Sequence, residues 1–150
     1  MAADLTVTIS ESVTINGALR GSSNTLTVAD VANTFERVVT CPHSNVTTIA
    51  TFNSNVYGSA GAIDLENTKY IRVTNTSTTA VMDLAIVTEN TNYQVVMTAS
   101  SSHLLCQADT AVIAEADTTP NFPTLEDITS IQVRPRASEN CDVEIFVASV

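Results

Sequence analysis

The stretch Leu5-Thr6-Val7-Thr8-Ile9-Ser10 alternates apolar and hydroxyl side chains without interruption. Successive side chains of a β-strand point to opposite faces, so this alternation predicts a strand with one apolar and one polar face. Val13 and Ile15 continue the pattern up to Asn16-Gly17, a dipeptide that readily adopts the positive φ angles of a tight hairpin turn. Residues 1–33 are therefore expected to form an extended arm or hairpin that packs on its own domain or on a neighbour.

The rest of the chain, residues 34–150, is predicted to be one β-sandwich domain of jelly-roll-like type. Short apolar runs recur between turn signals, and the predicted strands cover residues 35–41, 46–52, 70–73, 81–87, 93–98, 103–106, 128–133 and 143–147. An immunoglobulin-like sandwich and a barrel fit the same spacing. Two places are less regular: a short helical turn is expected near Asp30, and residues 111–116 suit a helical turn or a strand.

Composition supports an all-β class. The 150 residues are 44% hydrophobic and only 15% charged, Lys69 is the single lysine, and Thr and Val, which favour strands, are abundant. The net charge is −10. The six basic residues are spread along the chain and form no basic stripe: they are Arg20, Arg37, Lys69, Arg72, Arg134 and Arg136. Nucleic acids and anionic membranes are therefore not expected as partners. Nothing reads as a secretory signal or approaches the roughly 20 apolar residues of a membrane span.

Three cysteines, Cys41, Cys106 and Cys141, lie far apart and form no CxxC pair. They are expected to be buried or half-buried thiols of a protein made in a reducing cytosol. One disulfide plus one free thiol is the alternative, since the number of cysteines is odd.

Catalytic patterns are missing around the two histidines. Cys41 and His43 share a face of one strand without a third group to orient them, so His43 is interpreted as an exposed turn residue. His103 follows three serines, but no GxSxG elbow is present, and a polar loop is the simpler interpretation. Because HExxH, CxxC and phosphate-binding glycine patterns are also absent, we expect no enzyme and no cofactor.

Two clusters of charge remain as candidate sites. The first contains only carboxylates: Asp109, Glu115, Asp117, Glu126 and Asp127. They could form a weak Ca²⁺ site, although their spacing matches no calcium-binding loop. We therefore predict no metal. The second is Arg134-Pro135-Arg136, which suits a strand-end turn carrying salt-bridge partners or, alternatively, a site where a partner docks.

Several segments resemble small β-rich structural proteins of tailed bacteriophages, notably marine ones. The segments are Phe35-Glu36-Arg37-Val38-Val39-Thr40-Cys41-Pro42, Lys69-Tyr70-Ile71-Arg72-Val73-Thr74-Asn75, Ile128-Thr129-Ser130-Ile131-Gln132-Val133 and Asp142-Val143-Glu144-Ile145-Phe146-Val147-Ala148. The resemblance covers most of the chain from Phe35 onward and rests on spacing rather than on a diagnostic motif. It implies a virion component that is assembled in many copies in the host cytoplasm and has no catalytic residues.

Two functions follow as hypotheses. The first is a homo-oligomeric capsid decoration, or cement, protein that contacts the major capsid protein or other virion proteins. Its assembly contacts would come from the apolar residues of the arm, which are Leu5, Val7, Ile9, Val13 and Ile15. Arg134 and Arg136 are candidate docking residues. The second is a tail or fibre domain that binds a host glycan or receptor. For such binding the chain offers the aromatic residues Tyr57, Tyr70, Tyr93 and Phe122, but it has no Trp.

Overall fold

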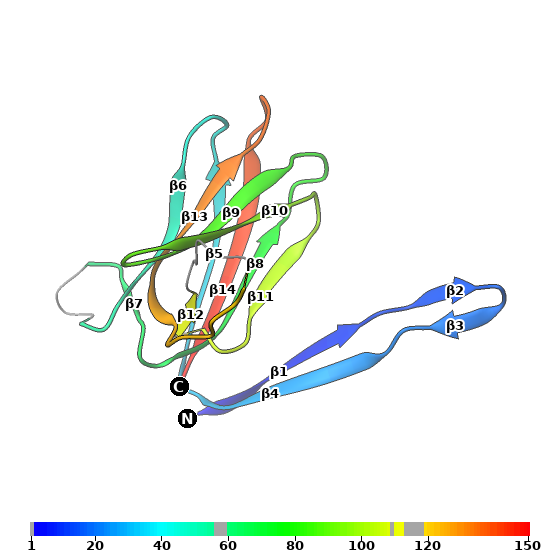
Figure 1. The fold of residues 1–150 in the computed structure, drawn as a ribbon, viewed down its shortest axis with the longest axis horizontal. Coiled ribbons are helices and arrows are strands. Elements are labelled where there is room, and N and C mark those ends of the chain that lie inside the picture. Colours follow the sequence, from blue (N-terminus) through cyan, green and yellow to red (C-terminus); the bar gives the residue numbers. More distant parts are fainter. Residues whose placement is uncertain (1, 56–59, 109, 113–118) are drawn as a thin grey trace.

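The computed structural model describes residues 2–55, 60–108, 110–112 and 119–150, and within them it contains strands and no helix. The predicted all-β class is therefore confirmed. Figure 1 shows two parts, an N-terminal ribbon (residues 3–31) and a body of paired strands, with the ribbon extending away from the body. No described helix could cross a membrane.

The N-terminal ribbon consists of two consecutive strand pairs. Strand β1 (Ala3–Ser10) pairs antiparallel with β4 (Ser23–Val31), and β2 (Val13–Ile15) pairs antiparallel with β3 (Ala18–Arg20). The tip turns at Asn16 and Gly17, whose φ angles are +50° and +77°. Positive φ at both positions is what a two-residue hairpin turn requires, so the turn predicted from Asn16-Gly17 is confirmed.

The helical turn expected near Asp30 is wrong. Asp30 lies in β4 with a φ of +59°, close to a shift in the β1–β4 register between Ala3 and Leu5. Its backbone N–H donates to Asp4 Oδ1 at 3.4 Å. Asp tolerates the left-handed conformation, and the cross-strand ladder outweighs the weak local helix preference of this segment.

One sheet of the body has the strand order β11-β8-β14-β5. Its strands are β5 (Asn33–Cys41), β8 (Thr68–Asn75), β11 (Ser102–Leu105) and β14 (Cys141–Ser149). Strand β5 follows β4 after the single residue Ala32, whose N–H donates to the Ser149 carbonyl at 2.9 Å. This bond ties the root of the ribbon to the end of β14.

The other sheet has the order β10-β9-β13-β6-β7, and β12 also pairs with β13. Its strands are β6 (Thr47–Asn53), β7 (Ile63–Asp64), β9 (Met82–Thr88), β10 (Asn92–Met97), β12 (Thr110–Val112) and β13 (Glu126–Pro135). Every strand predicted for the body is present. Strand β7 was not predicted, and β12 settles the choice at residues 111–112 in favour of a strand; residues 113–116 lie outside the described part.

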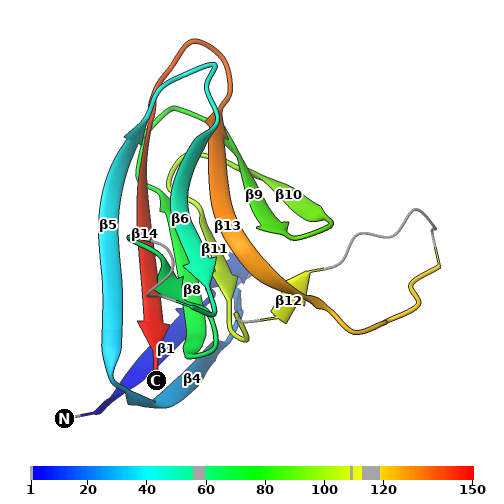
Figure 2. The same ribbon diagram turned by 90° about the vertical axis from the view of Figure 1, so that its left-hand side faces the viewer.

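The inner faces of the two sheets share one hydrophobic cluster, and Figure 2 shows the sheets facing each other. Alternate residues of β14, β9 and β13 supply its centre, including Ile145, Leu84 and Ile131, all with no exposed surface. Each such side chain contributes about 1.5–3 kcal/mol to folding by leaving water. Asn75, one of the buried polar residues, donates from Nδ2 to the Ala80 carbonyl at 2.8 Å, so its amide is paired. The body is thus stabilised without any disulfide.

Candidate functional site

The most unusual surface of the molecule is the apolar face of the N-terminal ribbon. Leu5 pairs with Val28 and Val7 with Leu26 across β1 and β4, and Ile9 lies on the same face. None of these side chains is fully buried: Ile9 is 46% exposed, Leu26 is 37% exposed, and the others are half-buried. We call this set the ribbon face. The core cluster includes none of its residues.

The opposite face of β1 and β4 carries hydroxyl groups, as the alternation predicts. Thr6 faces Thr27 and Thr8 faces Thr25, with the Oγ1 atoms of Thr8 and Thr25 3.2 Å apart. The part of the ribbon formed by β1 and β4 is therefore amphipathic. In addition, each strand of a two-stranded sheet leaves one row of backbone N–H and C=O groups unpaired. The ribbon accordingly offers both an apolar face and free strand edges.

The tip of the ribbon is also apolar and exposed. Val13, Ile15 and Leu19 are 53%, 55% and 72% exposed. A two-stranded hairpin on its own is marginally stable in water, and an exposed apolar stripe adds nothing to its stability until it is covered. All of the residues predicted for the assembly arm therefore lie together on one element, and the structure leaves all of them at least partly exposed.

The two candidate docking arginines, Arg134 and Arg136, lie together at the Pro135 end of β13. Arg136 donates to Asp83 Oδ1 from Nε at 2.7 Å and from Nη2 at 2.6 Å. Arg134 faces Asp83 in the strand register and is exposed, but forms no hydrogen bond or ion pair within the described part of the chain. The salt-bridge interpretation is thus confirmed for Arg136, whereas the guanidinium of Arg134 has no acidic partner among the described residues.

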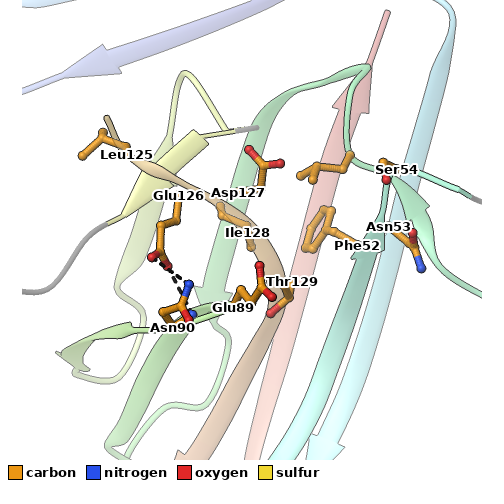
Figure 3. Close-up of a pocket in the computed structure, with 11 residues that line it drawn as sticks. Phe52, Asn53, Ser54, Glu89, Asn90, Leu125, Glu126, Asp127, Ile128 and Thr129 are labelled. Carbon is orange, nitrogen blue, oxygen red and sulfur yellow. Dashed lines mark hydrogen bonds between the residues drawn. The ribbon is translucent and has the colours of Figure 1, made fainter. Parts of the chain in front are cut away.

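A pocket of about 740 Å³ lies where β13 begins, beside the β9–β10 turn (Figure 3). Phe52 and Ile128 form its apolar wall, and Glu89, Glu126 and Asp127 bring carboxylates to its rim. None of the residues that line it is His, Cys or Lys. The acid–base groups of the lining are therefore carboxylates, with the hydroxyls of Ser54 and Thr129 beside them.

Glu126, the central carboxylate of this pocket, ties β13 to the β9–β10 turn. It accepts hydrogen bonds from the Thr88 hydroxyl, from Asn90 N at 3.3 Å and from Asn90 Nδ2 at 3.2 Å (Figure 3 draws the Asn90 contacts). These bonds, the Thr88 bond foremost, lower the pKa of the Glu126 carboxyl. Its acceptor capacity is used within the fold, so the structure gives Glu126 an anchoring role.

The carboxylate cluster predicted as a weak calcium site is only partly described. Asp109, Glu115 and Asp117 lie outside the described residues. In the part that the structure describes, no group of three or more His, Cys, Asp or Glu side chains is placed to hold a metal ion.

The two histidines occupy different surroundings. His43 is exposed in the turn after β5, as predicted. His103, by contrast, is not in a polar loop: it lies on β11, half-buried, with Nε2 3.0 Å from Tyr93 Oη on β10. Burial lowers the pKa of the His103 imidazole. This pair links the edge strands of the two sheets, because alternation turns His103 toward the inner face that Val73, its partner on β8, also occupies.

All three cysteines are free thiols. Cys41 and Cys141 are cross-strand partners on β5 and β14 and have no exposed surface, and burial raises the pKa of both thiols. Cys106 departs from the expectation of a buried thiol, because it follows the end of β11 and is exposed. High pKa values keep the buried pair protonated and poorly nucleophilic at neutral pH.

The aromatic residues proposed for glycan binding do not form one exposed platform. Tyr70 is 2% exposed and packs edge-on against Phe146, and Tyr93 is half-buried beside His103. Phe122 is 87% exposed, and Tyr57 lies outside the described residues.

The partners that the sequence alone missed are those distant along the chain, such as Asp83 for Arg136 and Thr88 for Glu126. Strand alternation places each of these residues on a face but does not select the neighbouring strand. No protein-family model, curated protein or solved structure matches this chain.

Proposed function

We propose that this protein is a non-enzymatic structural component of a tailed-phage virion, a capsid decoration or cement protein that works as a homo-oligomer. The observation that carries the proposal is the ribbon face, an apolar surface on an element that projects from the body. Exposed apolar patches of this kind mark surfaces that contact other proteins. The partners would be the major capsid protein and further copies of the chain on the virion, after assembly in the host cytoplasm.

We further infer that the body is a jelly roll. Support comes from the order of the eight main strands, β5-β14-β8-β11 in one sheet and β6-β13-β9-β10 in the other. In this order β5 pairs with β14, the last strand, and β6 with β13, the strand before it, so the chain closes back on its own beginning. Two Greek keys on two sheets give such an order. Jelly rolls occur in viral capsid proteins, which agrees with the proposal at the level of fold only.

The non-enzymatic part of the proposal rests on how the reactive side chains are used. His103 forms a hydrogen bond with Tyr93. The thiols of Cys41 and Cys141 lie in the core, where burial raises their pKa values. The Glu126 carboxylate accepts hydrogen bonds from Thr88 and Asn90. In each case the group serves the fold. The described surface accordingly favours recognition over chemistry.

The alternative, a tail or fibre domain that binds host glycan, has less support. Glycan sites generally use exposed aromatic rings to stack on sugars, and among the described aromatic residues Phe122 alone is largely exposed. A glycan array probed with the full chain tests this alternative, and specific binding there would favour it over the decoration function.

Reconstitution tests the decoration function. Heads of the encoding phage that lack this protein are incubated with the full-length chain, and binding and resistance to heat are measured. A chain carrying Val7→Glu and Leu26→Glu is expected to bind poorly and to give little protection. A matched chain with Thr8→Glu and Thr25→Glu carries the same added charge on the opposite face of the ribbon and should behave as wild type. Failure of the wild-type chain to bind heads would contradict the proposal.

A further inference from the structure

The ribbon face has no partner on its own body, and the structure suggests where a partner surface lies. The body has two outer faces, one on each sheet, formed by the residues that alternate with the buried ones. They differ in charge, in exposed apolar surface and in their position relative to the ribbon. These differences allow a choice between them.

The outer face of the β11-β8-β14-β5 sheet is acidic. Three of its residues are acids, Glu36, Asp142 and Glu144, whereas Arg72 is its base and already forms an ion pair with Glu144. The ribbon is itself acidic, with Asp4, Glu11 and Asp30 against Arg20. Like charges repel, so this outer face is a poor surface for the ribbon of another copy.

The outer face of the β10-β9-β13-β6 sheet, which we call the receiving face, differs in charge. Its charged residues include Asp83 and Asp127 against Arg134 and Arg136. Asp127 lies at the other end of β13, so at the Arg134 end the Arg136–Asp83 ion pair leaves Arg134 unbalanced. On a chain with a net charge of −10, the Arg134 end of this face is therefore a place where two bases, Arg134 and Arg136, meet one acid, Asp83. It therefore complements the acidic ribbon.

The receiving face is also uncharged and partly apolar over most of its area. A pocket lies on it, lined by Val46, Ala85, Gln94 and Gln132, with Asp83 and Arg134 at its charged end. Val46 and Val96 at its margins are 62% and 52% exposed. Small and uncharged side chains let an apolar ribbon approach closely without burying an unpaired charge.

The ribbon of one copy does not lie on the receiving face of the same copy. Figure 2 shows β1 and β4 leaving from the side of β5 and β14, with β9 and β10 on the other side of the body. The Ala32–Ser149 hydrogen bond holds the root of the ribbon there. A second copy can present its receiving face without any change in either chain.

We propose that the ribbon face (Leu5, Val7, Ile9, Leu26 and Val28) docks on the receiving face of a second copy of this chain. Each copy gives a ribbon and accepts one. Reciprocal exchange between two copies gives a two-fold dimer, and head-to-tail docking gives a ring when the rotation closes. The inference deepens the proposed decoration function by naming one partner, the chain itself. It does not depend on a capsid, so the two can fail separately.

Sedimentation velocity on the full-length chain over a range of concentrations tests the docking. Wild type is expected to associate reversibly. The ribbon variant, Val7→Glu with Leu26→Glu, and the face variant, Gln94→Glu with Val96→Glu, should each sediment as a monomer. Their matched controls should associate as wild type does: Thr8→Glu with Thr25→Glu on the hydroxyl face of the ribbon, and Thr34→Glu with Val38→Glu on the acidic outer face.

Mixing the two defective variants gives the sharpest outcome. The ribbon variant keeps an intact receiving face and the face variant keeps an intact ribbon, so an equimolar mixture should form a heterodimer although neither variant associates alone. Circular dichroism and thermal melting of each variant verify that it is folded. A wild-type chain that stays monomeric up to its solubility limit, or a mixture of folded variants that stays monomeric, would overturn the proposal.

Discussion

Val7 on β1 and Leu26 on β4 are direct cross-strand partners at the middle of the ribbon, and both leave part of their side chains open to solvent. A cross-strand apolar pair contributes about 0.2–1 kcal/mol to a sheet, which is small against the cost of ordering a long two-stranded element. Covering the pair with another protein surface would add the missing stabilisation. This relationship is the physical basis of the proposed assembly role, and it implies that ribbon and body respond differently to mutation.

Matched Ile→Ala substitutions test that difference. Ile131 is fully buried, so Ile131→Ala removes packed methyl groups from the core and should lower the free energy of unfolding by about 2–5 kcal/mol. Ile9 is 46% exposed on the ribbon, and Ile9→Ala should cost less than about 1 kcal/mol. Urea denaturation followed by circular dichroism measures both. Equal losses would show that the ribbon belongs to the cooperative unit of the body.

The junction between the two strand pairs of the ribbon, where Gly21 follows β3, requires a glycine. At Gly21 the φ angle is +121°, and an added Cβ would lie 2.1 Å from the Glu11 carbonyl oxygen. Gly21→Ala should therefore break the Glu11 N to Ser22 O hydrogen bond and speed amide exchange in the tip, with the melting temperature of the body unchanged. Gly17→Ala is the control, since its Cβ meets no atom within 4 Å and only the positive φ opposes it. Identical exchange in the two variants would contradict a steric role for Gly21.

Thiol reactivity should separate the cysteines. Cys106 is exposed, whereas Cys41 and Cys141 are buried and burial raises the pKa of both thiols. Ellman's reagent at neutral pH should label one thiol rapidly in the native chain and the other two only on unfolding. Cys106→Ser should abolish the rapid phase. Rapid labelling that survives this substitution would place Cys41 or Cys141 at the surface.

The His103–Tyr93 pair predicts a pH dependence. Burial lowers the pKa of His103 below the ordinary value of 6.5, so below that pH the unfolded chain takes up a proton before the folded chain does. The contribution to stability is complete above pH 6.5 and is lost as the pH falls through the folded-state pKa, with a slope of at most about 1.4 kcal/mol per pH unit. His103→Gln should weaken the decline between neutral and acidic pH. In His43→Gln, which alters an exposed turn, the decline should persist; the same decline in both variants would exclude His103 as its source.

Much of the fold was predictable from the sequence because alternation is a local signal. The body strands and the Asn16-Gly17 turn appear where the pattern predicts them. The wrong or missed predictions of secondary structure lie where tertiary contacts determine the conformation of the segment. Asp30 joins a strand through its ladder and its bond to Asp4, and the two-residue β7 exists only through its parallel pairing with β6.

The candidate site was predictable to a similar extent. The apolar arm residues and Arg134 with Arg136 could be named from their pattern, since both features are local. The charge difference between the two outer faces could not, because it depends on which strands become neighbours. Arg136 and Asp83, for example, lie 53 residues apart in the chain.

The proposed role in a virion is tested most directly by electron cryomicroscopy of intact particles of the phage that we propose as the source of this chain. For a decoration protein, density for the body is expected on the outer surface of the head, with each ribbon bound to a neighbouring subunit and its apolar face covered. A virion without this protein, or one in which the ribbons extend into solvent with Val7 and Leu26 uncovered, would contradict it.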